Sequence, residues 1–127
     1  MEGKMSQSAS EVSRISPDRV KECLDAGEAI FILDARAQRN DQQIPSSFWF
    51  DPMDLLKADR ILVSARKDQL IVAYDDSPDE TLSSQIAEKL VSQGYWNAHP
   101  LEGGMSAWRE QGFPIEPRPV ETLIGTE

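Results

Sequence analysis

The sequence is short of cysteine, histidine and positive charge. It has one cysteine, Cys23, and one histidine, His99, among 127 residues. A single thiol excludes an internal disulfide and a cysteine-based metal site, and it suits a reducing compartment. Thirteen Lys and Arg residues face 22 Asp and Glu residues, giving a formal net charge of −9. This charge repels nucleic acid and anionic lipid, so we expect neither as a partner.

Long apolar runs are also missing, because no stretch approaches the roughly 20 residues that cross a bilayer. We therefore predict no membrane span and a cytoplasmic location. The length suits a single domain with a real core. Residues 1–13 are small and polar without the apolar centre of a signal peptide, so they are predicted to form a flexible tail. The domain is expected over residues 14–116, followed by a second flexible tail over 117–127.

Three places share a pattern typical of helix starts, a capping Ser or Asp followed by proline. They are Ser16-Pro17, Asp51-Pro52 and Ser77-Pro78. The capping side chain accepts a backbone N–H, and proline suits the first helical position because its missing N–H would be unpaired there. Glu80 stands three residues after Ser77, which predicts a capping box around Pro78. We expect a helix to begin at each of the three prolines.

Buried strands are predicted from two short, continuously apolar runs, 29–33 and 70–74. Runs of this kind are typical of strands covered on both faces of a parallel sheet. Weaker strand candidates lie at 47–50 and 95–100. Because strands and helices alternate, we expect an α/β fold with a parallel sheet between helices. Ligands of such sheets bind beyond the carboxyl ends of the strands, which directs attention to Asp34 and to the loop from Asp75.

Three stretches together resemble the rhodanese homology domain. Residues 32–36 (Ile-Leu-Asp-Ala-Arg) resemble its strand ending in Asp-x-Arg, and residues 42–47 (Gln-Gln-Ile-Pro-Ser-Ser) resemble a degraded form of its Gly-His-Ile-Pro-Gly-Ala turn. Residues 93–108, from Gln-Gly-Tyr to Leu-Glu-Gly-Gly-Met-Ser-Ala-Trp, are similar to its closing signature. The order and spacing of the three stretches are specific, and the resemblance covers roughly residues 14–116.

The resemblance implies a small three-layer α/β fold with about five parallel strands and helices on both faces. It also implies a catalytic loop directly after the strand at 70–74. In active members this loop begins with a cysteine whose thiolate accepts a sulfane sulfur from a donor such as thiosulfate and passes it to a nucleophile. The matching residue here is Asp75, and a carboxylate cannot form a persulfide. We therefore predict a domain without sulfurtransferase activity.

The loop at the family's catalytic position is strongly acidic. It consists of Asp75, Asp76, Ser77, Pro78, Asp79 and Glu80, with four carboxylates and no Lys or Arg. An anion site needs free backbone N–H groups at a helix start and positive charge nearby. We expect the Asp75 carboxylate, or a neighbour, to stand where a substrate anion would otherwise bind. Asp34 and Arg36 are expected to support the loops through hydrogen bonds.

Other functions remain as alternatives. Cys23 offers residual sulfurtransferase activity, but it shares an apolar stripe with Val20 and Leu24, which indicates core packing. Asp75 with Mg²⁺ or Ca²⁺ offers phosphoryl chemistry, although no second acidic strand end except Asp34 and no evident lysine accompany it. No metal or cofactor is predicted, and the lone His99 is assigned no catalytic role. The leading hypothesis is a non-catalytic binding or regulatory module with an unknown protein partner.

Overall fold

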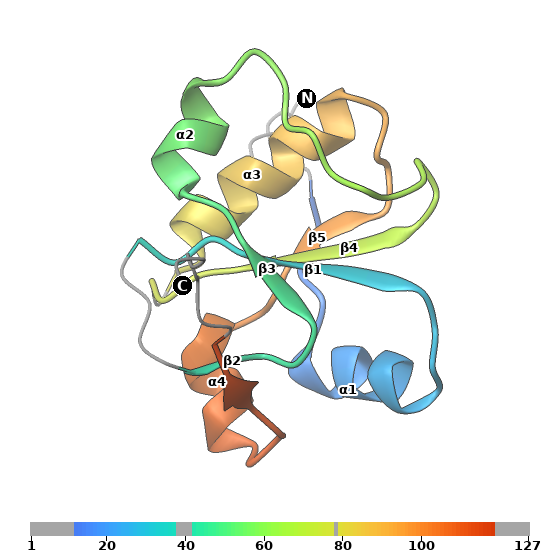
Figure 1. Ribbon diagram of the computed structural model, residues 1–127, viewed down its shortest axis with the longest axis vertical. Coiled ribbons are helices and arrows are strands. Elements are labelled where there is room, and N and C mark those ends of the chain that lie inside the picture. The colour runs from blue at the N-terminus through green and yellow to red at the C-terminus, as the bar shows by residue number, and fades with distance from the viewer. Residues whose placement is uncertain (1–11, 38–41, 78, 119–127) are drawn as a thin grey trace, which may run out of the picture.

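The computed structural model describes residues 12–37, 42–77 and 79–118, and Figure 1 shows their arrangement. In chain order the elements are α1 (Pro17–Asp25), β1 (Ile30–Asp34), β2 (Gln42–Gln43), β3 (Ser47–Trp49), α2 (Pro52–Lys57), β4 (Leu70–Tyr74), α3 (Thr81–Ser92), β5 (Ala98–Pro100), α4 (Gly104–Glu110) and β6 (Glu116–Pro117). No helix within these residues is long and apolar enough to cross a membrane.

The main sheet has the order β3-β1-β4-β5, and every neighbouring pair is parallel. Beyond β5, Ile15 makes a single parallel bridge to Leu101, which extends the sheet by one residue pair. The predicted α/β class with a parallel sheet is confirmed. The expected number was about five strands, whereas the described residues form four in this sheet, with the Ile15 bridge beside them. The short strands β2 and β6 pair separately and antiparallel.

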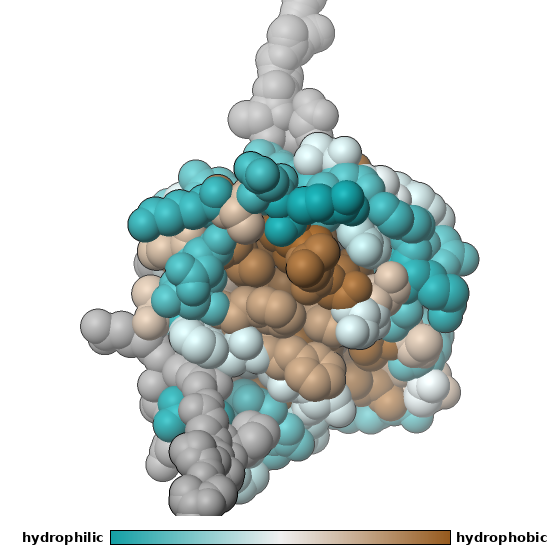
Figure 2. Space-filling view, turned by 45° about the horizontal axis from the view of Figure 1, so that its top comes forward, coloured by the Kyte–Doolittle hydropathy of each residue, from teal (hydrophilic) through white to brown (hydrophobic). Residues whose placement is uncertain are grey.

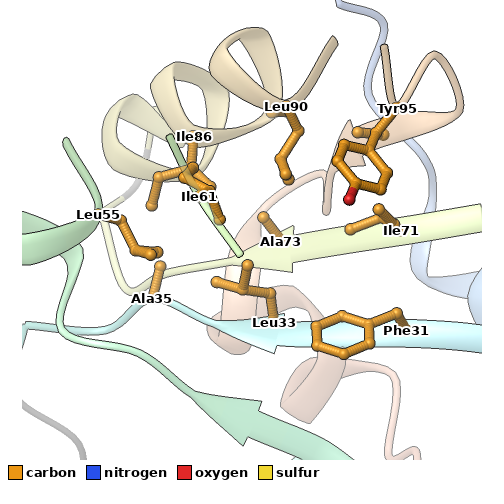
Figure 3. Close-up of a cluster of buried hydrophobic side chains, with 12 residues drawn as sticks. Phe31, Leu33, Ala35, Leu55, Ile61, Ile71, Ala73, Ile86, Leu90 and Tyr95 are labelled. Carbon is orange, nitrogen blue, oxygen red and sulfur yellow. The ribbon is translucent and has the colours of Figure 1, made fainter. Parts of the chain in front are cut away.

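Two clusters of buried side chains fill the spaces between the sheet and the helices. Successive strand residues point to opposite faces, so Leu33 and Ala73 pack against α2 and α3, while Ile32 and Val72 face α1 and α4. Figure 3 shows the first cluster, with Leu33 and Ala73 beneath Ile86 and Leu90 of α3. The two covered faces explain why the β1 and β4 segments are continuously apolar.

Two of the three predicted helix starts are confirmed. Ser16 Oγ accepts the N–H of Arg19 at 3.1 Å, and Asp51 Oδ1 accepts the N–H of Met53 at 2.9 Å. The third prediction is wrong, because α3 begins at Thr81 and not at Pro78, which itself lies outside the described residues. The side chains expected to form the capping box there have other partners, described below.

An apolar hollow lies on one face of the molecule, bordered by hydrophilic residues (Figure 2). It has a volume of about 350 Å³ and is lined by Ile30, Phe31, Phe48, Phe50, Leu62, Ser64 and Gln69. Phe48 of β3 stacks on Phe31 with ring centroids 5.3 Å apart, yet its side chain is still largely exposed. The hollow is therefore a surface feature made by β1, β3 and the segment after α2.

Candidate functional site

The site begins where β4 ends, at Asp75, and this residue is fully buried. Its Oδ1 accepts the backbone N–H of Ser77 at 2.9 Å and the Ser77 hydroxyl at 2.8 Å. Its Oδ2 accepts the N–H of Ser83, in the first turn of α3, at 2.7 Å. Both carboxylate oxygens are therefore bonded to groups of the loop and helix that follow Asp75.

These bonds occupy the part of the loop suited to an anion. The first N–H groups of a helix have no partner within the helix and carry partial positive charge, so they bind anions well. Here the Asp75 carboxylate takes the Ser83 N–H and a loop N–H at Ser77. The negative charge bonded to these N–H groups therefore comes from the chain itself; that it takes the place of a substrate anion stays a prediction.

The backbone of Asp75 is held by the start of α4. The N–H of Met105 donates to the Asp75 carbonyl oxygen at 3.1 Å. Gly104 has φ +61°, and a Cβ added to it would lie only 2.3 Å from that same oxygen. Glycine is therefore required at position 104, both for the left-handed backbone and for the close approach. The Gly-Gly pair of the closing signature thus positions the loop.

Glu80 ends the loop, and its side chain turns away from Ser77. Its backbone is left-handed, with φ +55°, and its side chain is almost fully buried. Oε2 accepts the N–H of Gly103 at 3.0 Å, while Oε1 forms an ion pair of 2.7 Å with Arg14 Nε. The predicted capping box fails because these distant partners, and not the N–H of Ser77, hold the carboxylate.

The remaining two loop carboxylates are exposed. Asp79 Oδ1 accepts the Thr81 N–H at 3.3 Å and the Thr81 hydroxyl, and the latter bond lowers the pKa of this carboxyl. Loss of hydration raises the pKa of Asp76, and the charges of Asp34 and Asp75 add to this against the opposing Arg36. Asp75, Asp79 and Glu80 thus bond to separate groups. Within the described residues, no group of three or more His, Cys, Asp or Glu side chains could hold a metal ion.

Asp34 and Arg36 form a buried two-point ion pair at the end of β1. Arg36 Nε donates to Asp34 Oδ1 at 2.9 Å and Nη2 donates to Oδ2 at 2.7 Å. Nη2 also donates to the carbonyl of Gln42, and the guanidinium lies 5.5 Å from the centre of the Tyr74 ring. The Arg36 carbonyl accepts the indole N–H of Trp49 at 2.9 Å. The pair therefore joins the ends of β1, β3 and β4 to the segment before the 44–47 turn.

Tyr74 and Glu116 also support this end of the sheet. The Tyr74 hydroxyl accepts the N–H of Ile44 at 3.3 Å and lies 3.0 Å from the Ser47 hydroxyl, and burial raises the Tyr74 pKa. Glu116 Oε2 accepts from the Gln43 side chain at 2.8 Å and from the Ser46 N–H at 3.2 Å. Sequence reasoning missed both residues. The one available signal was the hydroxyl of Tyr74 at the end of the otherwise apolar 70–74 run, since a buried hydroxyl needs a hydrogen-bond partner.

The rhodanese-like domain model matches residues 16–111, most of the chain. The chain belongs to this family. Among similar solved structures, the Alr3790 protein from Anabaena sp. has a TM-score of 0.69 and 32% identity, covering 84% of this chain and 94% of that one. The solution structure of the rhodanese-like domain of Alr3790 has a TM-score of 0.68 and 29% identity, and the match covers 90% of this chain and 85% of that one. No curated protein matches the chain.

The fold is also shared with a larger protein. SseA from Escherichia coli, described as a 3-mercaptopyruvate sulfotransferase, has a TM-score of 0.68 at 20% identity. The match covers 88% of this chain and 53% of that chain. At this identity the likeness shows the fold alone. This rhodanese-like domain and the matched part of SseA therefore share the same α/β arrangement.

Two other residues weighed from the sequence lie away from the loop. Cys23 is buried on α1. His99 lies on β5, where its Nδ1 is 2.9 Å from the Ser13 carbonyl oxygen and its Nε2 is 2.8 Å from Asn97 Oδ1. These bonds join β5 to the residues before α1. Among the described residues of this rhodanese-like domain, neither side chain is bonded to the 75–80 loop.

We expect the thiol of Cys23 to be unreactive in the folded chain. Burial raises its pKa and the nearby Glu28 adds to the effect, so the nucleophilic thiolate is scarce at neutral pH. A chromogenic disulfide reagent should label the native chain on the order of a hundredfold more slowly than the urea-unfolded chain, followed by absorbance. Equal labelling rates would show that the thiol is accessible.

Proposed function

We propose that this rhodanese-like domain does not transfer sulfur and acts as a binding or regulatory module. The supporting observation is the Asp75 carboxylate, buried at the carboxyl end of β4 with both oxygens bonded to the loop and α3. An oxygen anion at this point cannot accept and release a sulfane sulfur. The proposed setting is cytoplasmic, with a protein as the partner.

Sulfur transfer of the family's kind needs a sulfur nucleophile at the start of the loop. In the active members that this loop resembles, a cysteine thiolate attacks the outer sulfur of thiosulfate, the sulfur–sulfur bond breaks, and sulfite leaves with the electron pair. A nucleophile such as cyanide then attacks the persulfide and departs as thiocyanate, which regenerates the thiolate. Only a sulfur nucleophile at position 75 completes this cycle. Cys23 is buried with a raised pKa, which argues against its taking that place.

The decisive experiment compares the native protein with Asp75→Cys in an assay of thiocyanate formation from thiosulfate and cyanide. We expect no turnover by the native protein and slow turnover by Asp75→Cys, because the Ser77 and Ser83 N–H groups would then be free to stabilise the thiolate. Turnover by the native protein at the rate of the variant would contradict the proposal.

Two control variants make this result specific. Asp76→Cys places a thiol one residue further along, on an exposed side chain outside those bonds, and it should remain silent. Cys23→Ser should leave every rate unchanged. A native activity that disappears in Cys23→Ser would instead support the alternative of residual sulfurtransferase chemistry at Cys23.

The phosphoryl alternative at Asp75 has less support from the geometry. A phosphoryl-accepting carboxylate needs one oxygen open to the substrate and an oxygen-rich site for the metal. Asp75 is fully buried, and its oxygens already accept three hydrogen bonds. A rise in the melting temperature on adding Mg²⁺ or Ca²⁺, lost in Asp75→Asn, would favour this alternative over the binding module.

A further inference from the structure

Residues 12–15, which we call the N-terminal strap, lie along the end of β5. The N–H of Ile15 donates to the Pro100 carbonyl at 2.9 Å, and the Ile15 carbonyl accepts the N–H of Glu102 at 2.9 Å. Val12 packs against the cluster beneath α2 and α3. The strap is therefore an edge segment attached by two backbone hydrogen bonds at Ile15, the contact of Ser13 with His99, and the packing of Val12 and Ile15.

Arg14 connects this strap to the 75–80 loop. Its Nε lies 2.7 Å from Glu80 Oε1, and its Nη1 lies 3.9 Å from Glu102 Oε2. The Glu80 side chain is 4% exposed, whereas that of Arg14 is 55% exposed. The buried partner of the pair thus belongs to the loop, and the accessible partner belongs to the strap.

Glu80 depends on Arg14 for its cation. Its other oxygen bonds to the neutral N–H of Gly103, and its own backbone is in the unfavourable left-handed region. Without Arg14 the carboxylate would be a buried charge without a counter-ion, which is costly until water reaches it. Water reaches the carboxylate if the Glu80 end of the loop opens.

We propose that the N-terminal strap is a latch that holds the Glu80 end of the 75–80 loop in place through Arg14, so that displacing the strap frees that end of the loop. This inference rests on the proposed function, in which the loop is a closed, non-catalytic part of the module. Edge segments with few bonds open more readily than the core. The strap can therefore detach while the sheet stays folded, and a partner that displaces it would alter the loop without touching it.

The test is amide hydrogen exchange in residues 76–83 of the full chain, read by mass spectrometry. Arg14→Gln should accelerate exchange there on the order of tenfold, because the opened loop no longer competes with the ion pair. Arg19→Gln is the matched control, because Arg19 is an exposed arginine on α1 whose partner is Glu22. Loop exchange in Arg14→Gln that equals the exchange in Arg19→Gln would overturn the latch.

A second pair of variants separates the latch from general loosening of the N-terminus. Glu80→Gln removes the charge but keeps an oxygen for the Gly103 N–H. In that background Arg14→Gln should have no further effect on loop exchange, since the two side chains act as one unit. Additive effects would overturn the proposal. Thiosulfate turnover by the native protein, measured separately, tests the proposed function and leaves this comparison unchanged.

Discussion

Arg36→Met is expected to lower the free energy of unfolding by about 3–5 kcal/mol, because it leaves the buried Asp34 carboxylate without its cation. The variant removes both side-chain bonds of the ion pair and the bond to the Gln42 carbonyl. Arg36 and Asp34 are 1% and 0% exposed, so water cannot replace these partners in the folded state. Urea unfolding followed by circular dichroism measures the change.

Two further variants test this explanation. Arg19→Met removes an arginine from an exposed ion pair with Glu22, and it should cost less than about 0.5 kcal/mol. Arg36→Met combined with Asp34→Asn removes the unpaired charge, so the pair should cost less than the sum of the two single variants. Equal losses in Arg36→Met and Arg19→Met would show that the buried pair is not a major support.

Gly104→Ala is expected to destabilise the domain by about 2–5 kcal/mol, combining the cost of a left-handed non-glycine residue with that of overpacking. The new Cβ would meet the Asp75 carbonyl oxygen at 2.3 Å, so the loop or the start of α4 must move. The hydrogen bond from Met105 to that oxygen would weaken as well.

Gly27→Ala is the matched control for this prediction. Gly27 has φ +71° and no atom within 4 Å of an added Cβ, so it carries the backbone cost without the clash. Gly27→Ala should lower the free energy of unfolding by about 1–2 kcal/mol. The difference between the two variants, read from urea unfolding, measures the close contact between α4 and the loop. No difference would mean that the contact is relieved at little cost.

The sequence was sufficient to predict the class of fold, because local signals agreed with it. The apolar runs at β1 and β4 have the length and continuity of strands covered on both faces, and proline with a capping side chain marks α1 and α2. Such signals depend on neighbouring residues only. They therefore predict which elements exist, and alternation predicts the parallel sheet.

The start of α3 could not be predicted in this way, since tertiary contacts decide it. Ser77 and Glu80 have the spacing of a capping box, yet the Asp75 carboxylate takes the N–H of Ser77, and Glu80 reaches Gly103 and Arg14. Gly103 and Arg14 are distant in sequence from Glu80. A local sequence pattern cannot reveal such competing partners, because only the tertiary structure brings them close to Glu80.

Part of the site was accessible from the residues alone. The resemblance and the acidic loop directed attention to Asp75, whose carboxylate is buried and bonded within the loop and α3. That it occupies the family's catalytic position stays a prediction. The supports around it were less visible: Tyr74 reads as the end of an apolar strand, and Glu116 lies 70 residues from its partner Ser46. Tyr74 and Glu116 acquire their roles through contacts that form only when the strands and the 44–47 turn come together.

The carboxylate at position 75 also affects how the loop withstands oxidants. A reactive loop cysteine is open to peroxide, alkylating agents and heavy metals, and oxidation beyond the sulfenic acid is largely irreversible. Asp75 offers none of these reagents a sulfur atom, and the chain's one thiol is buried on α1. The loop should therefore keep its shape under oxidative stress that would inactivate thiol-dependent relatives.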